Sequence, residues 1–235
     1  MSKLHFKIQV ASENGVIVYC KGAPILACNQ AIVELSKRLK QSNIKGLENV
    51  IPAFDSVLVV YDINTTDHYH VQHDIKDCYL TLLAQHNLDS VVKQPQKVID
   101  IPVFYGAPQD NDIARVAEHN GLSVSEVIKI HSQSEYRVFS IGFAPGFAFM
   151  GELDKRIAMP RLDTPRKAVP KGAVAIADRQ TAIYPNTSPG GWNIIGLCPI
   201  SLFNPNHQPA CHFAVGDQVR FHAIDANEYQ ILSDD

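Results

Sequence analysis

The sequence lacks the features of several large protein classes. No stretch approaches the roughly 18 consecutive apolar residues needed to cross a bilayer. The first ten residues alternate polar and apolar side chains and contain no signal-peptide core. The five cysteines are odd in number, and no two are spaced as Cys-x-x-Cys. This usage is unlike a disulfide scaffold, and we expect a protein of the reducing cytoplasm.

Neither sign of charge dominates the chain. There are 21 Lys and Arg against 24 Asp and Glu, a formal net charge of -3. Nucleic acid is not the expected partner, because neutralising phosphates requires a basic excess. Hydrophobic residues make up 46% and charged residues 19% of the sequence, a balance typical of folded globular proteins rather than disordered ones.

Familiar catalytic motifs are also missing. The sequence contains no GxxxxGK[ST] phosphate loop, no GxGxxG, no GxSxG nucleophile elbow and no HExxH. His68, His70 and His73 resemble a metal cluster, but only the last two would share one face of a helix. No cysteine or acidic residue completes a recognisable ligand set. We therefore predict no metal site in this chain.

Proline usage divides the sequence. Only Pro24 and Pro52 of the 14 prolines precede position 95, so we place a boundary within residues 91–97. The prediction is a domain over residues 1–94 and a second domain over residues 95–235.

The first domain has the pattern of a two-layer α+β fold. Residues 4–19 read as a hairpin, because alternating strands flank an Asn14-Gly15 turn. Apolar residues at spacings of three and four predict a helix over 25–39 and a second over 75–86. Residues 57–61 read as a buried strand. Two helices packed on a sheet would form two layers.

The second domain begins with a strand over 98–104 and two helices. The first helix starts at Asn111/Asp112 and stops at Asn120-Gly121, and Ser123 with Glu126 forms a capping box for the second. Short strands punctuated by Gly and Pro follow, which predicts a barrel or sandwich. These strands are expected at 136–141, 173–177, 182–184, 192–197 and 218–224.

Three features of this second domain indicate a binding site. Residues 141–151 place three Gly and one Pro among large apolar side chains, which fits either a barrel corner or a rigid wall of a pocket. Residues 155–179 are rich in Lys and Arg, and could be a solvated face or a site for an anion. Gly190-Gly191 beside Trp192 could be a structural turn or a nest of backbone N–H groups. Together they predict a small-molecule site for an anionic or carbonyl-bearing ligand.

The same residues carry a family resemblance. The segments 139–151, 180–185 and 188–192, the two Pro-Arg steps and Phe203-Asn-Pro205 resemble the allophanate hydrolase subunit 1 family. The resemblance covers nearly the whole chain. It implies an N-terminal two-layer α+β domain followed by a mainly β, cyclophilin-like barrel domain.

The resemblance also implies a function. We expect a non-autonomous subunit of an ATP-dependent 5-oxoprolinase, which hydrolyses 5-oxo-L-proline to L-glutamate. The expected partners are the A and C subunits of that enzyme, the latter carboxyltransferase-like, with ATP bound by the complex rather than by this chain alone. Two alternatives remain open: an inhibitor of a sensor histidine kinase, and a subunit of a urea- or allophanate-processing enzyme.

With the resemblance, the candidate substrate-binding residues can be given roles. Arginines would bind an anionic group of the substrate, a Gln-Thr pair would bond the lactam amide, glycine amides would stabilise the carbonyl oxygen, and aromatic residues would wall the site. The catalytic nucleophile and base are not identified. The candidates are Phe147, Arg161, Arg166, Gln180, Thr181, Tyr184, Ser188, Gly190, Gly191 and Trp192. A second expectation is that part of a patch formed by Phe143, Phe147, Phe149 and Met150 contacts the C subunit.

Overall fold

The computed structural model describes residues 4–85, 98–106 and 111–233. The chain divides into two compact units, Met1–Pro95 and Gln96–Asp235, here called the first and second units. The domain boundary expected at 91–97 lies outside the described residues, as does the predicted end of the second helix at His86. Each unit is described by itself.

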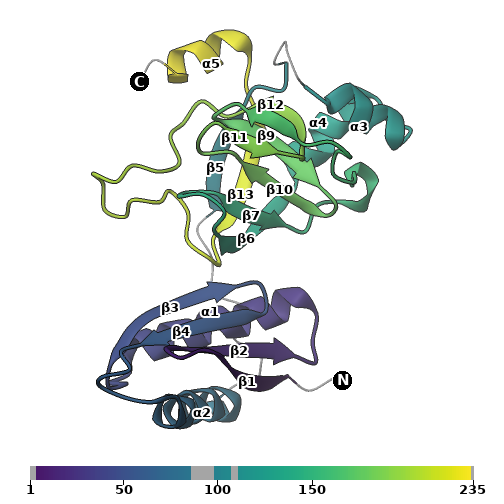
Figure 1. Cartoon of the computed structure of the whole chain (residues 1–235). Coiled ribbons are helices and arrows are strands. Elements are labelled where there is room, and N and C mark those ends of the chain that lie inside the picture. The colour runs from purple at the N-terminus through teal and green to yellow at the C-terminus, as the bar shows by residue number, and fades with distance from the viewer. Residues whose placement is uncertain (1–3, 86–97, 107–110, 234–235) are drawn as a thin grey trace. The chain divides into compact units, whose positions relative to one another are not determined.

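The first unit combines an antiparallel sheet with two helices (Figure 1). Its elements are β1 (His5–Ser12), β2 (Gly15–Lys21), α1 (Ile25–Gln41), β3 (Leu47–Ala53), β4 (Ser56–Tyr61) and α2 (His68–Gln85). The strand order is β1-β2-β4-β3. The predicted hairpin is confirmed, with Val10 paired to Val16 across the Asn14-Gly15 turn. Strand β3 has no counterpart among the predicted elements.

One face of this sheet forms the core of the first unit. Val16 on β2 and Val57 on β4 are fully buried, and they belong to one apolar cluster with Leu35 of α1 and Ile75 of α2. Buried and half-buried residues alternate along both strands, because successive side chains of a strand point to opposite faces. The two helices therefore cover a single face of the sheet.

The second unit contains a curled seven-stranded sheet, a separate two-stranded sheet and several helices. The strands of the two sheets are β5 (Val98–Val103), β6 (Glu135–Ile141), β7 (Ala148–Gly151), β8 (Arg166–Val169), β9 (Ala173–Ala177), β10 (Gln180–Ile183), β11 (Ser188–Gly190), β12 (Asn193–Leu197) and β13 (Gln218–Ala223). Its helices are α3 (Ile113–His119), α4 (Val124–Gln133), α5 (Ala226–Ser233) and a short 3₁₀ helix, Lys155–Ile157.

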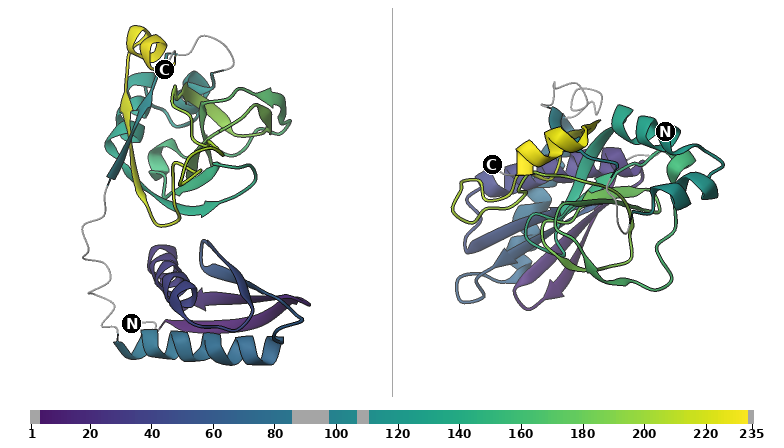
Figure 2. Two further views of the ribbon diagram at one scale, coloured as in Figure 1. Left: turned by 90° about the vertical axis from the view of Figure 1, so that its left-hand side faces the viewer. Right: turned by 90° about the horizontal axis from the view of Figure 1, so that it is seen from above.

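The sheet curls far enough for its two edges to meet. The strand order is β12-β9-β10-β7-β6-β13-β5, with β8 and β11 forming a separate pair. Just beyond β5, Phe104 exchanges two backbone hydrogen bonds of 2.8 and 2.9 Å with Leu197 on β12. Figure 2 shows β13 beside its parallel partner β5. Helix α5 follows β13 in the chain, and its Tyr229 ring contacts the ring of Phe104. The result is a barrel-like sheet, while the finer expectation of a cyclophilin-like topology stays a prediction.

The local signals before the barrel strands are confirmed. Helix α3 begins after Asp112, and its C-cap is Asn120. Both halves of the predicted capping box are present on α4: the Ser123 hydroxyl accepts from the Glu126 N–H, and the Glu126 carboxylate accepts from the Ser123 N–H. Within residues 141–151, Ile141 ends β6, residues 142–147 form a loop, and Ala148–Gly151 forms β7.

Strand β9 is buried on both faces, which separates two apolar layers. Val174 and Ile176 point into the barrel core, whereas Ala173, Ala175 and Ala177 point outward. Alanine suits the outward positions because large rings pack directly on them. This outer layer, here called the outer-face cluster, consists of Phe147, Val169, Ala173, Ala175, Ala177, Ala182, Tyr184, Trp192 and Ile194. In the described part of the chain, no helix is long and apolar enough to span a membrane.

Candidate functional site

Three of the predicted site residues form the centre of the outer-face cluster. The Phe147 ring lies edge-on to Tyr184 and Trp192, with centroid distances of 5.2 and 5.9 Å. Phe147 and Tyr184 are 2% exposed and Trp192 is 5% exposed. Edge-to-face contacts of this kind fix ring positions. The tryptophan is thus packed, as expected if the segment is a structural turn, and one of the predicted arginines, Arg161, lies over its ring.

The loop over residues 142–147 is closed by its own backbone. The Gly142 N–H donates to the Phe147 carbonyl and the Phe147 N–H to the Ala144 carbonyl, both at 3.0 Å. Gly146 has φ of 85°, and a Cβ there would lie 2.8 Å from the Cβ of Phe203, so a glycine is required. The loop is therefore a fixed turn packed against the segment that contains Phe203.

This loop presents one aromatic ring to solvent. Phe143 has φ of 71°, which is unusual for a residue other than glycine, and it is 67% exposed. Phe149 is half-buried, whereas Phe147 and Met150 are buried. The contact patch expected from these four residues is therefore reduced to Phe143 and part of Phe149.

The adjacent glycines, Gly190 and Gly191, differ in how closely they are packed. A Cβ on Gly190 would overlap the Tyr184 hydroxyl, so the absent side chain makes room for that ring. A Cβ on Gly191 would find only ordinary contacts, the nearest at 3.6 Å from the Leu162 oxygen. Ser188 lies two residues before Gly190 on β11, half-buried and paired with Val169 of β8. Close packing of Tyr184 accounts for Gly190, and the proposed N–H nest is not needed to explain it.

The side chains of Gln180 and Thr181, two neighbouring candidates on β10, point to opposite faces of the sheet. Thr181 is fully buried in the barrel interior, where its hydroxyl lies 3.0 Å from Nε2 of His131. Gln180, one residue earlier on β10, is half-buried on the opposite face. Thr181 therefore does not line the same site as Tyr184 and Trp192, which corrects the predicted set. The cause is the period of two in strand side chains.

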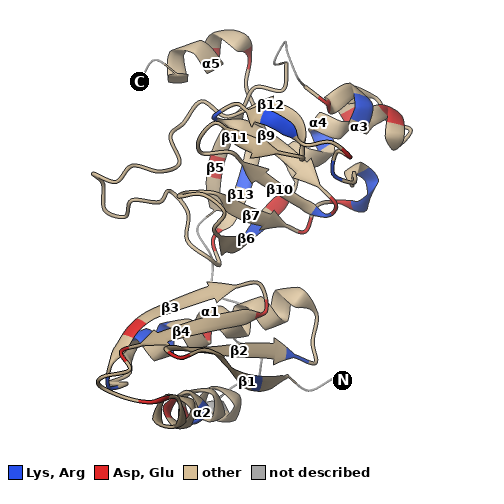
Figure 3. Ribbon diagram, viewed as in Figure 1, with Lys and Arg blue, Asp and Glu red and all other residues tan. Residues whose placement is uncertain are grey.

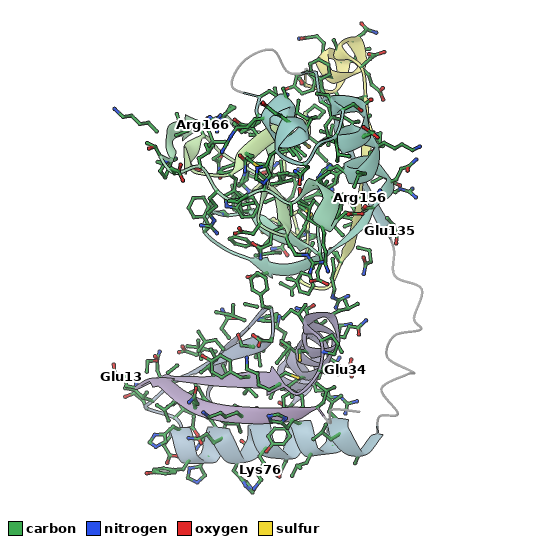
Figure 4. All side chains as sticks on the ribbon, turned by 90° about the vertical axis from the view of Figure 1, so that its right-hand side faces the viewer. Glu13, Glu34, Lys76, Glu135, Arg156 and Arg166 are labelled. Carbon is green, nitrogen blue, oxygen red and sulfur yellow. The ribbon has the colours of Figure 1, made fainter. Side chains whose placement is uncertain are left out.

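Three of the seven Lys and Arg residues in the basic segment over 155–179 pair with acids from outside it. Arg156 pairs with Asp154 at 2.7 Å, and Arg179 pairs with Glu152 at 3.0 Å. Figure 3 shows acidic and basic residues interspersed along the second unit, and Figure 4 shows Arg156 and Arg166 on different parts of it. The segment is not a single basic face.

Two arginines lie at the outer-face cluster. Nη2 of Arg166 is 2.9 Å from Oδ1 of Asp112, and the guanidinium carbon of Arg161 lies over the Trp192 ring at 5.8 Å from its centroid. Burial raises the pKa of the Tyr184 hydroxyl, while the positive charges of Arg161 and Arg166 act to lower it. Both guanidinium groups are therefore within electrostatic reach of this phenol, which stays protonated at neutral pH and can donate a hydrogen bond.

Two residues of this region had no functional signal in the sequence. Asp112 was recognised only as a helix start, yet its carboxylate pairs with Arg166 and accepts a 2.8 Å hydrogen bond from the Ile194 N–H. His131 stands on α4 without a motif, and it is fully buried between Tyr105 and Thr181. Their partners lie 26 to 82 residues away in sequence, so no local spacing could have identified them.

Two histidines of α2 lie near acidic residues. Nδ1 of His70 lies 3.0 Å from Asp67, and Nε2 of His73 lies 3.7 Å from Asp77, all on exposed side chains. Within residues 4–85, 98–106 and 111–233, no group of three or more His, Cys, Asp or Glu residues is placed to hold a metal ion.

Comparisons with known proteins identify the family. Residues 6–213 match the family described as carboxyltransferase domain, subdomain C and D. The chain is 37% identical over 204 residues to the 5-oxoprolinase B subunit of Bacillus subtilis, covering 84% of each protein. It is 32% identical over 209 residues to the 5-oxoprolinase B subunit of Escherichia coli O157:H7, covering 89% of this chain and 92% of that one.

A solved structure shares the same fold. The crystal structure of TTHA0988 superposes with a TM-score of 0.77 at 30% identity, over 92% of this chain. The chain spans only 40% of the length of TTHA0988. The chain therefore belongs to the carboxyltransferase-domain family, in the branch that contains the B subunits of 5-oxoprolinase. The family resemblance carried by the motifs of the second unit is confirmed.

Proposed function

We propose that this chain is the B subunit of a 5-oxoprolinase, which converts 5-oxo-L-proline and ATP to L-glutamate, ADP and phosphate. The observation that carries the proposal is 37% identity to the Bacillus subtilis protein over 84% of both chains. That similarity spans both units, including the segments of the outer-face cluster.

The chemistry explains why ATP is required. An unstrained five-membered lactam is a poor electrophile, and transfer of the terminal phosphoryl group of ATP to its carbonyl oxygen would activate the ring carbon. Water adding to that carbon allows the C–N bond to break with the nitrogen leaving as the amine. A second water then releases phosphate. Arg161, beside the outer-face cluster, offers a cation to such a substrate, but the described residues there include no nucleophile paired with a base. We therefore infer that the complete active site belongs to the assembled complex.

We assign the remaining parts of that complex to the A and C subunits, with ATP bound by the complex in the cytoplasm. The matching region forms only 40% of TTHA0988, where further sequence lies on the same polypeptide. A separate, carboxyltransferase-like C subunit would supply the corresponding surface here. Phe143, exposed on a turn closed by two backbone hydrogen bonds, is suited to contact it, because rigid aromatic residues are typical anchors of interfaces.

The experiment compares isolated and assembled proteins. Glutamate formation from 5-oxo-L-proline and ATP is measured for this chain alone, for the A and C subunits alone, and for all three together. We expect turnover only in the complete mixture. Turnover by this chain alone would contradict a non-autonomous role, and selective turnover of urea or allophanate would replace the substrate assignment.

A further inference from the structure

The two arginines at the outer-face cluster, Arg161 and Arg166, differ in whether a neighbouring carboxylate balances their positive charge. Arg166 forms a 2.9 Å ion pair with Asp112, and the two side chains are 21% and 10% exposed. The same carboxylate also accepts from the Ile194 N–H. In this position the positive charge of Arg166 is already balanced, and the pair ties the start of α3 to β8 and β12.

The charge of Arg161 is not balanced in this way. The residue is exposed, and it has no ion-pair partner within the described parts of the chain. Its guanidinium lies over Trp192, whose ring is fixed by Phe147 and Phe149 at centroid distances of 5.9 and 6.0 Å. A guanidinium over a ring keeps its N–H groups available at its edge, where a carboxylate can accept two hydrogen bonds.

The neighbouring cations lack this combination of an aromatic contact and an unpaired charge. Lys167 is exposed on β8 next to Arg166, but no ring contact joins it to the outer-face cluster among the residues described. Arg156 and Arg179 are paired with acids. Arg161 alone combines a packed aromatic support with an unneutralised charge in this part of the structure. Packing against the ring reduces the freedom that the side chain must lose on binding.

We propose that Arg161 binds the carboxylate of 5-oxo-L-proline, and that Arg166 with Asp112 is a structural ion pair. The inference rests on the proposed function and assigns the substrate contact within it. The lactam ring itself carries no charge, so the carboxylate is the only anionic group that distinguishes this substrate from an unsubstituted lactam. A fork of guanidinium N–H groups matches the geometry of that carboxylate.

The test uses the assembled enzyme and two substrates. The kcat/KM for 5-oxo-L-proline and for its uncharged carboxamide, 5-oxo-L-prolinamide, is measured with wild-type, Arg161→Ala and Lys167→Ala chains. Lys167→Ala is the matched control, because it removes an exposed cation six residues away. Hydrogen bonds to a charged group are typically worth about 1.5–3 kcal/mol, so we expect Arg161→Ala to lower kcat/KM for the acid by about 10- to 100-fold. The value for the carboxamide should change by no more than about twofold.

The outcomes separate this inference from the proposed function. Loss of the preference for the acid in Arg161→Ala, with the control close to wild type, supports it. An unchanged preference in Arg161→Ala, or loss of co-purification with the other subunits, would overturn it while leaving the proposed function intact. A wild-type complex that does not hydrolyse 5-oxo-L-proline would remove both.

Discussion

A buried histidine makes the stability of the second unit sensitive to acid. His131 is fully buried on α4, with Nδ1 2.6 Å from the Tyr105 hydroxyl and Nε2 3.0 Å from the Thr181 hydroxyl. Its ring stacks on Phe221 at a centroid distance of 4.5 Å. Burial lowers the pKa of His131 from 6.5 to about 3, because the charged imidazolium would lose its hydration.

The size and sign of the effect follow from this difference. Between pH 6.5 and 3 the unfolded chain binds a proton at His131 that the folded chain does not. The contribution of neutral His131 to the free energy of unfolding is therefore fully present above the unfolded pKa and is lost progressively as the pH falls below it. At about 1.36 kcal/mol per pH unit, acidification from pH 7 to pH 5 should cost about 2 kcal/mol through this residue.

Urea denaturation at the two pH values measures this cost. Trp192 is the only tryptophan, so its emission reports on the second unit alone. His131→Gln, which retains hydrogen-bonding groups, should lose about 2 kcal/mol less than wild type between pH 7 and pH 5, whatever its stability at pH 7. His222→Gln, a change at an exposed histidine, is the control and should behave as wild type. Equal losses in wild type and His131→Gln would refute the reasoning.

Three further substitutions test the packing and a helix cap of the second unit, each followed by the Trp192 emission during denaturation. Gly190→Ala should lower the free energy of unfolding by about 1–3 kcal/mol because its Cβ would overlap the Tyr184 hydroxyl. Gly191→Ala, with contacts of 3.6 Å or longer, should cost clearly less, and equal costs would contradict the close packing. Ser123→Ala should cost about 1 kcal/mol by removing the capping box of α4, and an unchanged midpoint would show that the cap is dispensable.

The sequence was most informative where the determining interactions are local. The Asn14-Gly15 hairpin and the Ser123–Glu126 cap each depend on residues within a few positions of one another, and both were predicted correctly. Strand β3 was missed because its sequence, LENVIPA, combines a proline with polar residues that obscure any alternation. An edge strand tolerates these residues, since one side of its backbone is unpaired.

The site was predicted in part for related reasons. Phe147, Tyr184, Gly190 and Trp192 do pack together, as their positions in the irregular segments suggested. Thr181 was assigned to the site together with Gln180 from the family motif, whereas both residues lie on β10 and the alternation of that strand sends Thr181 inward. Which cations of the basic segment are paired could not be predicted, because the acids that pair with Arg156, Arg166 and Arg179 lie outside the segment in sequence.

The central claim is that this chain is a necessary subunit of a 5-oxoprolinase. The most direct measurement adds the purified chain in rising amounts to fixed A and C subunits and follows glutamate released from 5-oxo-L-proline and ATP. The account predicts no release without the chain, a rise with added chain, and a plateau at a fixed molar ratio to the C subunit. Release that is already maximal before the chain is added, or that never appears at any ratio, would contradict the claim.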